Sequence, residues 1–485
     1  MINTILSYTT KGLSTLVLGL LVFIFSCKTG EELPNMAPET KLSVENINLS
    51  GDKRLNSTVN LTWFGTDVDG YVRHYEIKIN EGEWLKTQIQ DSTFLFDIDP
   101  DADSTDIEFY VRAVDDENVA DPTPAYIKVP LKNSPPIVSF DKASVTEDTT
   151  NLVISFRYRA SDPDGDATLK KGFVRANDGA WLEIDLNQKL ISLIAENTST
   201  LGKGNAKLYY GIEKNASLTI DGFVNGGDNI IQLKVSDIAN SESKVDSTIN
   251  IYTKAKTSDL LAVGGHNKSL SATYNALIAT NYQDLDVVDY ARDGGKYQPK
   301  FWDPTFRLLA MEYDKIFFHT EEGTTSNPFS GLDGTLLDFA APVIQQLIDN
   351  NKKVMVSTSF SNGADLSIIG DILSIDSFSS ARGQAFFTND SSALSTDATY
   401  PIVQPANFLL AADPFYPGVN AEVFYNAQLT PSGGWSGPRC VAIRRRNNNN
   451  QVNLVLFSVE LHKLNKNSIN QNQLISKILN EAFNW

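Results

Sequence analysis

Cysteine and histidine are scarce in this sequence. There are two cysteines and four histidines. If Cys27 is covalently modified, Cys440 has no partner, so no intramolecular disulfide forms and the fold depends on burial of apolar side chains. None of the histidines is spaced from another as in an HxxxH motif, so the sequence predicts no preformed zinc site. The four are His74, His266, His319 and His462.

Positive charge is also in short supply. The chain has 41 Lys and Arg against 59 Asp and Glu, a formal net charge of −18. An acidic surface repels phosphate backbones, which excludes nucleic acid as an expected partner and is compatible with bound divalent cations. The composition is otherwise that of a globular protein, and 485 residues predict about three domains at roughly 150 residues each.

The long apolar run lies near the N-terminus. Leu13–Phe25 follows Lys11 and leads into Ser26-Cys27. It is shorter than the roughly 20 apolar residues that span a bilayer, and has the length of a signal-peptide core. The segment Ile24–Cys27 resembles the lipobox of bacterial lipoproteins, although Phe25 stands where a small residue is usual.

This resemblance implies cleavage before Cys27 and acylation, palmitate included, of its sulfur and new amino group. More than one acyl chain gives stable membrane anchoring. Lys28 replaces the Asp that resembles an inner-membrane retention signal, so the outer membrane is expected. Glu31 and Glu32 resemble surface-export signals, which favours the cell surface over the periplasm. The alternatives are a plain secretory signal and an uncleaved transmembrane anchor.

An internal repeat occupies the part of the chain from Pro38 to Lys254. Short strands with period-two alternation are separated by Gly, Pro, Asn and Asp, a pattern typical of β-sandwiches. Leu61–Gly70 matches Phe156–Gly165, both ending in DxDG, and Trp84 and Trp181 follow 14 and 16 residues later. The repeat resembles tandem fibronectin type III or other immunoglobulin-like modules of bacterial surface proteins. We expect both tryptophans in the cores, with sugar-stacking platforms as the alternative.

The DxDG turns raise the question of calcium, because alternate carboxylates can gather on one side of a loop. No complete twelve-residue calcium loop with its closing Glu is present. The favoured alternative is a turn, in which Asp bonds its own backbone and Gly adopts a positive φ. No other cofactor is expected. The candidate ligands are Asp67, Asp69 and Asp115 in the first module, and Asp162, Asp164, Asp166 and Asp237 in the second.

From Ser258 onward, continuous apolar runs alternate with helical patterns. This alternation predicts a mostly parallel sheet covered by helices. The expected strands are Leu260–Val263, Leu285–Val288, Lys315–Phe318, Lys353–Val356 and Asn453–Phe457. The expected helices are Leu270–Ala279, Leu336–Asp349, Leu366–Leu373 and Gln473–Phe483.

This order resembles the class I glutamine-amidotransferase-like fold, especially its trehalose-utilisation-like branch. The resemblance implies a Cys nucleophile on the turn after a central strand, but the turn Ser357–Gly363 contains no cysteine. Ser359, His462 and Glu460 are an alternative catalytic set, and Cys440 is expected to be a buried apolar residue. The segments that carry the likeness are Leu260–Asn267, Tyr313–Thr320, Val354–Ser359 and Val455–Leu461.

The carboxyl ends of parallel strands form the expected crevice for a ligand. In the alternative interpretation, Gly264 and Gly265 only form a turn and His266 caps the next helix. The crevice candidates are Gly264, Gly265, His266, His319, Glu321, Thr358 and Ser359.

The sequence thus predicts a multidomain chain, with two all-β sandwiches followed by an α/β domain. We expect a lipid-anchored, non-catalytic envelope protein whose α/β head binds a glycan, peptide or protein partner. The alternatives are a carbohydrate-active or other hydrolase with its site in the head, and a structural subunit of an outer-membrane assembly. The expected divisions are signal peptide 1–26, lipidated linker 27–37, sandwiches 38–132 and 133–256, and α/β domain 257–485.

Overall fold

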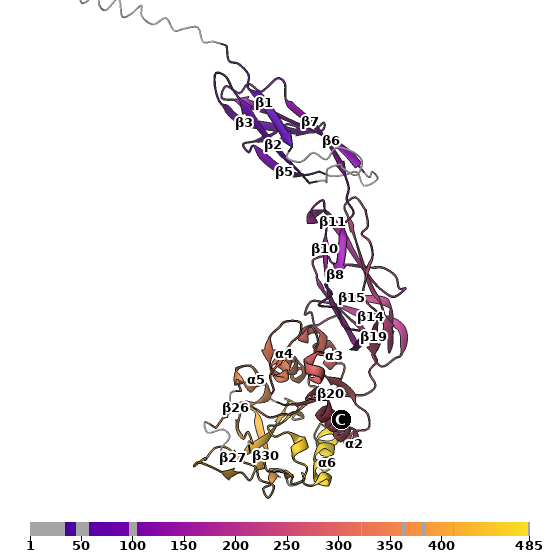
Figure 1. Cartoon of the computed structure of the whole chain (residues 1–485), viewed down its shortest axis with the longest axis vertical. Helices are drawn as coiled ribbons and strands as arrows, with labels where there is room; N and C mark the ends of the chain where they lie inside the picture. Colours follow the sequence, from indigo (N-terminus) through magenta and orange to yellow (C-terminus); the bar gives the residue numbers. More distant parts are fainter. Residues whose placement is uncertain are drawn as a thin grey trace, which may run out of the picture. The chain divides into compact units, whose positions relative to one another are not determined.

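The computed structural model describes residues 34–44, 58–96, 104–321, 323–360, 364–379, 385–410 and 412–483. The chain forms two compact units, the first ending at Ser134 and the second beginning at Pro135 (Figure 1). Cys27 and the expected signal peptide lie outside the described residues. Among the described helices, none combines the length and apolar character needed to cross a membrane.

The first unit contains an antiparallel β-sandwich. One sheet has the strand order β1-β2-β5, and the other has the order β4-β3-β6-β7. Their bounds are β1 Glu39–Val44, β2 Thr58–Thr66, β3 Val72–Ile79, β4 Leu85–Thr87, β5 Asp91–Leu95, β6 Ser104–Asp115 and β7 Ala125–Lys132. Alternate side chains of β6 point inward, so Phe109, Val111 and Ala113 pack against Leu61 and Trp63 of β2. The expected sandwich is confirmed here.

The second module is a larger sandwich at the start of the second unit. Its sheets have the orders β15-β14-β13-β10-β8, β12-β11-β17-β18 and β16-β19-β9. The strands of the first half are β8 Ile137–Phe140, β9 Thr149–Asn151, β10 Val153–Ser161, β11 Leu169–Ala176, β12 Leu182–Ile184 and β13 Leu190–Ala195. The others are β14 Gly202–Tyr210, β15 Leu218–Asn225, β16 Gly227–Asn229, β17 Ile231–Asp237, β18 Asp246–Ser247 and β19 Ile251–Lys254.

The two tryptophans of the repeat lie outside the sandwich cores. Each precedes the short strand β4 or β12, and each indole is half-buried. The guanidinium carbon of Arg112 lies 4.2 Å from the ring centre of Trp84, and that of Arg175 lies 4.5 Å from that of Trp181. The expectation of core packing is therefore wrong, because cation–π contacts hold both rings against neighbouring arginines.

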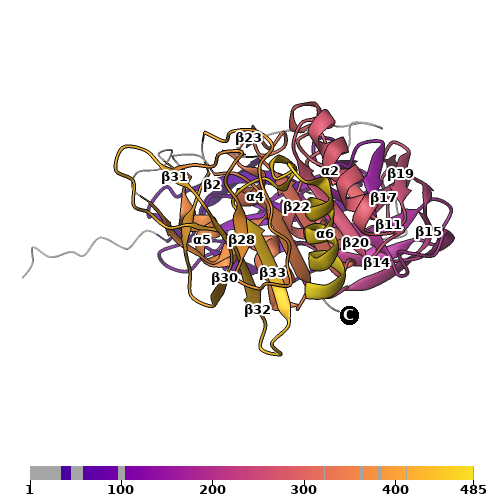
Figure 2. The same cartoon turned by 90° about the horizontal axis from the view of Figure 1, so that it is seen from below.

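The α/β domain is built on an eight-stranded sheet in the order β21-β20-β22-β25-β33-β32-β30-β28. Figure 2 labels β20, β22, β33, β32, β30 and β28 of this sheet. The first five strands pair in parallel, as expected, and three antiparallel strands extend the sheet. The parallel strands are β20 Leu260–Gly265, β21 Asp286–Asp289, β22 Lys315–Thr320, β25 Lys353–Ser357 and β33 Val452–Phe457. The antiparallel strands are β28 Ala393–Ser395, β30 Ala421–Ala427 and β32 Cys440–Arg446.

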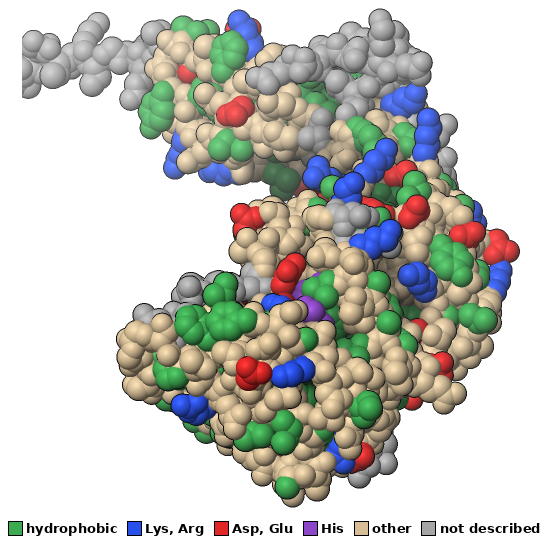
Figure 3. Space-filling view, turned by 60° about the horizontal axis from the view of Figure 1, so that its bottom comes forward, with side chains coloured by type: hydrophobic (Ala, Val, Ile, Leu, Met, Phe, Trp, Pro, Cys, Tyr) green, Lys and Arg blue, Asp and Glu red, His purple; other side chains and the backbone are tan. Residues whose placement is uncertain are grey.

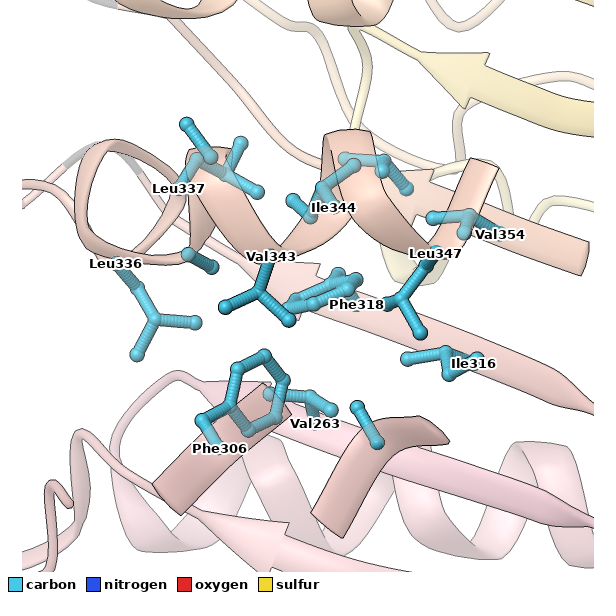
Figure 4. Packing of buried hydrophobic residues seen from close by; sticks show 14 of the residues in the cluster. Val263, Phe306, Ile316, Phe318, Leu336, Leu337, Val343, Ile344, Leu347 and Val354 are labelled. Atoms are coloured by element: carbon cyan, nitrogen blue, oxygen red, sulfur yellow. The ribbon is translucent and has the colours of Figure 1, made fainter. Parts of the chain in front are cut away.

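Helices cover both faces of this sheet. One face packs against α3 Arg307–Met311, α4 Leu336–Asp349 and α5 Leu366–Leu373, and the other against α2 Lys268–Asn281 and α6 Ser468–Lys477. Figure 4 shows Val343, Ile344 and Leu347 of α4 lying over Ile316 and Phe318 of the sheet. Burying side chains of this size stabilises the fold by about 1.5–3 kcal/mol each.

Shorter elements complete the domains. Three two-stranded pairings involve β23 Thr325–Ser326 with β24 Asp333–Gly334, β26 Ile375–Phe378 with β29 Phe415–Pro417, and β27 Ala385–Phe386 with β31 Thr430–Pro431. The 3-10 turns are η2 Asp166–Thr168, η3 Arg292–Gly295 and η5 Leu461–Lys463. The π-helical turns are η4 Trp302–Phe306 and η6 Ile478–Ala482.

The second sandwich and the α/β domain share a hydrophobic core. Leu152, Val153 and Ile194 of the sandwich belong to the same buried cluster as the residues under α4. Arg307, which is 4% exposed, adds a polar link. Its Nε donates to Asp303 Oδ1 at 2.6 Å, and its guanidinium donates to the carbonyl oxygen of Glu213 in the sandwich at 2.9 Å. These contacts explain why both domains belong to one compact unit.

Candidate functional site

Two glycines end the first parallel strand of the α/β domain. In the sheet register, Gly264 lies opposite His319 and Gly265 opposite Thr320. A Cβ atom on Gly264 would lie 3.1 Å from His319 Cε1, and one on Gly265 would lie 2.8 Å from Thr320 Cβ. The glycines therefore make room for side chains of the neighbouring strand.

Behind this strand end lies a buried stack of three rings. His266 follows β20, Tyr274 belongs to α2, and His319 belongs to β22, and all three are 0% exposed. The Tyr274 ring centre lies 5.1 Å from that of His266 and 4.5 Å from that of His319, with interplanar angles of 8° and 9°. Parallel strand ends and the first turns of α2 thus fix both imidazoles in position.

Neither buried histidine has a hydrogen-bond partner at either ring nitrogen among the described residues. His266 does not cap α2, because the side chain of Asn267 accepts the hydrogen bonds from the Ser269 and Leu270 amides. Burial, aided by the charges of His462 and Lys463, lowers the pKa of His266 to about 3. Burial also holds the pKa of His319 well below its usual value. Both imidazoles are therefore neutral at pH 7 and present unshared lone pairs.

Glu460 and His462 approach the stack from the segment after β33. Glu460 directly precedes the 3-10 turn η5, and His462 lies within it. Glu460 is 2% exposed and forms an ion pair with Lys463. The Nδ1 atom of His462 lies 3.2 Å from the hydroxyl of Tyr274. Burial is the main reason that the pKa of His462 falls to about 4.

A serine–histidine–acid triad is not formed by the described residues. Ser359 Oγ donates to Glu460 Oε1 at 3.5 Å, whereas the described hydrogen bonds include none between Ser359 and His462. The hydroxyls of Thr358 and Thr320 lie 3.1 Å apart and are buried. In this arrangement Ser359 contacts a carboxylate and not the histidine base of a triad.

The structure brings together a group of potential metal ligands that the sequence did not reveal as a set. One ligand atom from each of His266, Glu321 and Glu460 lies within 4.8 Å of the other two. Residues 266, 321 and 460 all follow strands that the sequence predicts to be parallel. Their shared position after strand ends was the signal that could have predicted this group. The spacing rule behind the expectation of no zinc site considers only neighbours in sequence. On the face drawn in Figure 3, histidine reaches the surface beside acidic and basic side chains.

A separate cavity of about 530 Å³ lies between the second sandwich and the α/β domain. Its lining includes Tyr290, Tyr297, Asn275 and Gln298 from the α/β domain. The amide oxygens of Asn275 and Gln298 are buried and have no hydrogen-bond partner among the described residues. None of the potential metal ligands lines this cavity.

The candidate calcium ligands of the DxDG turns bond to backbone amides. Asp69 and Asp115 accept backbone hydrogen bonds at 2.9 and 2.8 Å, and Asp162 and Asp237 each accept one at 2.8 Å. Gly165 has a φ of 110°, which agrees with the turn interpretation. Among the described residues, these aspartates do not form a group of ligand atoms as close as the one in the α/β domain. Calcium binding stays a prediction.

Cys440 lies in β32, where its side chain is 3% exposed. Burial raises the pKa of this thiol to about 12. A thiol that stays protonated and inaccessible is a poor nucleophile, so its position agrees with the expected packing role.

Comparisons with known proteins address the β-modules. No family model and no curated protein matches the chain. A two-domain fibronectin type III segment of chicken tenascin covers 44% of this chain and 99% of its own length, with 13% identity and a TM-score of 0.22. Fibronectin(III)-like modules of Clostridium thermocellum CbhA cover 19% of this chain and 97% of their own length, with 21% identity and a TM-score of 0.16.

A protein described by its carbohydrate-binding modules of the β-sandwich superfamily covers 46% of this chain and 86% of its own length, with 10% identity and a TM-score of 0.18. These TM-scores are too low to carry an argument about function. The fold assignment rests on the sheets themselves, which define a protein of two β-sandwich modules and one α/β domain.

Proposed function

We propose that this protein is a lipid-anchored, non-catalytic component of the outer membrane, displayed at the cell surface, that binds a glycan. The cavity between the second sandwich and the α/β domain carries this proposal. Its volume of about 530 Å³ falls within the usual range for small-molecule sites. The sandwich modules and the lipid on Cys27 would hold this site at the membrane.

The lining of the cavity suits a sugar better than an apolar ligand. The unpaired amide oxygens of Asn275 and Gln298 can accept hydrogen bonds from sugar hydroxyls. Tyr297 is 47% exposed, so its ring can pack against the C–H face of a pyranose. Lys296 and Lys300 also line the cavity and add hydrogen-bond donors.

The α/β domain supports a binding role more than amide transfer. We also propose that this domain is related to the amidotransferase-like fold, because its strands are parallel and the first of them leads into the turn Gly264-Gly265-His266. The described part of the turn after β25 offers hydroxyls and no thiol, and His462 bonds to Tyr274. A hydrolase stays the second candidate, because the buried Glu460 lies close to His266 and Glu321.

Glycan binding is tested with the full chain in detergent and a panel of envelope and host oligosaccharides. We expect Tyr297→Ala and Asn275→Ala each to raise the dissociation constant about 5- to 30-fold, because each removes a contact worth about 1–2 kcal/mol. Tyr416→Ala, at a 45% exposed tyrosine outside the cavity lining, should bind like the wild type. Isothermal titration calorimetry provides the measurement.

Failure of every glycan to bind would rule out this ligand class and favour a protein partner. Product release from a bound oligosaccharide would instead identify the protein as a hydrolase.

Membrane attachment is tested separately by Cys27→Ala. We expect the variant to move from the membrane fraction to the soluble fraction after cell lysis, because the acyl chains that anchor the protein through Cys27 are lost. Metabolic labelling with an alkyne palmitate analogue should mark the wild type and leave the variant unlabelled. Retention of the variant in membranes would contradict the lipoprotein proposal, and proteinase treatment of intact cells would report surface display.

A further inference from the structure

Three side chains from distant parts of the sequence meet at one edge of the α/β sheet. His266 comes directly after β20, Glu321 directly after β22, and Glu460 three residues after β33. Since these strands run parallel, their carboxyl ends lie at the same edge. One ligand atom of each side chain lies within 4.8 Å of the other two.

We propose that His266, Glu321 and Glu460 bind a first-row divalent transition-metal ion, with Zn²⁺ as the expected occupant. An imidazole nitrogen combined with two carboxylates suits Zn²⁺, whereas Ca²⁺ and Mg²⁺ favour shells of oxygen alone. Three protein ligands leave one position for water or a ligand group. The site shares no residue with the cavity or the lipid anchor, so it does not depend on the proposed function.

The unsatisfied nitrogens of His266 give independent support. Its side chain is 0% exposed, and neither ring nitrogen has a hydrogen-bond partner among the described residues. A buried polar atom without a partner costs about 1–3 kcal/mol, which a bond to a metal ion would remove. By contrast, His462 uses its Nδ1 atom with Tyr274.

The charges around the group also favour a cation. Glu460 is 2% exposed, and a buried carboxylate is costly without a positive partner. Lys463 now supplies that charge, but its side chain is 41% exposed and can rotate into solvent. A divalent ion would neutralise Glu460 and Glu321 together and release the lysine.

The geometry needs only a small closure. Bonds of about 2.0–2.1 Å in a tetrahedral site place ligand atoms roughly 3.3 Å apart, compared with the present limit of 4.8 Å. Stacking on Tyr274 fixes the ring of His266. The exposed side chain of Glu321 can make the movement, since its rotamers are not restricted by burial.

The test uses the full chain in detergent after removal of metal by a chelator. Calorimetric titration with Zn²⁺ should give one ion per chain, and Co²⁺ should produce visible d–d absorption bands. Glu321→Gln and Glu460→Gln should each raise the dissociation constant for Zn²⁺ at least 100-fold. His74→Gln in the first module and Glu481→Gln on the surface of the α/β domain are matched controls that should retain wild-type affinity.

Glu321 is exposed, so its substitution tests the site without disturbing the core. Circular dichroism should confirm that each variant is folded. Lack of stoichiometric Zn²⁺ binding by the wild type would overturn the proposal. Wild-type affinity in both glutamine variants would do the same, because the ion would then occupy a different site.

Discussion

The metal-free α/β domain should lose stability steadily as the pH falls from about 6.5 toward 4. The pKa of His266 is lowered from 6.5 to about 3, and the pKa of His319 lies well below 6.5. Between these folded-state values and 6.5, the unfolded chain binds protons that the folded chain excludes. The stability contributed by the neutral imidazoles is therefore complete above pH 6.5 and is lost as the pH falls.

Each of these two histidines should contribute about 1.4 kcal/mol to the free energy of unfolding per pH unit in the steep part of this range. Urea unfolding at pH 7, 6 and 5, monitored by intrinsic fluorescence, measures the slope. His319→Leu removes one titrating group at similar volume, so its slope should fall by about one proton equivalent. An unchanged slope in this variant would contradict the prediction, because it would show that the pKa of His319 does not differ between the folded and unfolded chain in this pH range.

Arg307→Met should destabilise the second unit by about 2–3 kcal/mol, because Asp303 and the Glu213 carbonyl lose their shared donor. The lost link joins the second sandwich to the α/β domain. We therefore expect one cooperative thermal transition to broaden or split in two. Differential scanning calorimetry, with unfolding followed in parallel by circular dichroism, provides the measurement.

Arg446→Met is the matched control for this substitution. Arg446 is 30% exposed and pairs with Glu422 at 3.0 Å, so its removal should cost no more than about 1 kcal/mol. Equal destabilisation by the two substitutions would contradict a special role for Arg307. A single sharp transition in Arg307→Met would show that apolar contacts alone keep the two domains cooperative.

Much of the α/β fold could be predicted because its central strands and helices have strong local patterns. The expected helices Leu336–Asp349 and Leu366–Leu373 coincide with α4 and α5, and continuous apolar runs marked the five parallel strands. The region between α5 and β33 was largely missed. Its strands β26, β27 and β29 contain two to four residues, too few to show a period, and their pairing depends on distant segments.

The candidate site was predictable only in part. Gly264, His266 and His319 were expected at strand ends, and the parallel pairing of β20 with β22 brings them together. Glu460 was named only as the acid of a catalytic set with Ser359 and His462, because the pattern did not show the turn η5 that follows β33. The convergence of Glu460 with Glu321 depends on strand order, in which β25 separates β22 from β33. Sequence spacing carries no information on that order.

The shared core of the second sandwich and the α/β domain also bears on how such a chain can evolve. The core of the first sandwich is made from its own residues, so this module can be duplicated, exchanged or deleted as a cassette. Leu152, Val153 and Ile194 instead complete the hydrophobic cluster of the α/β domain. Recombination between these two domains would expose apolar surface on both fragments, so they should be inherited as a single cassette with coevolving faces.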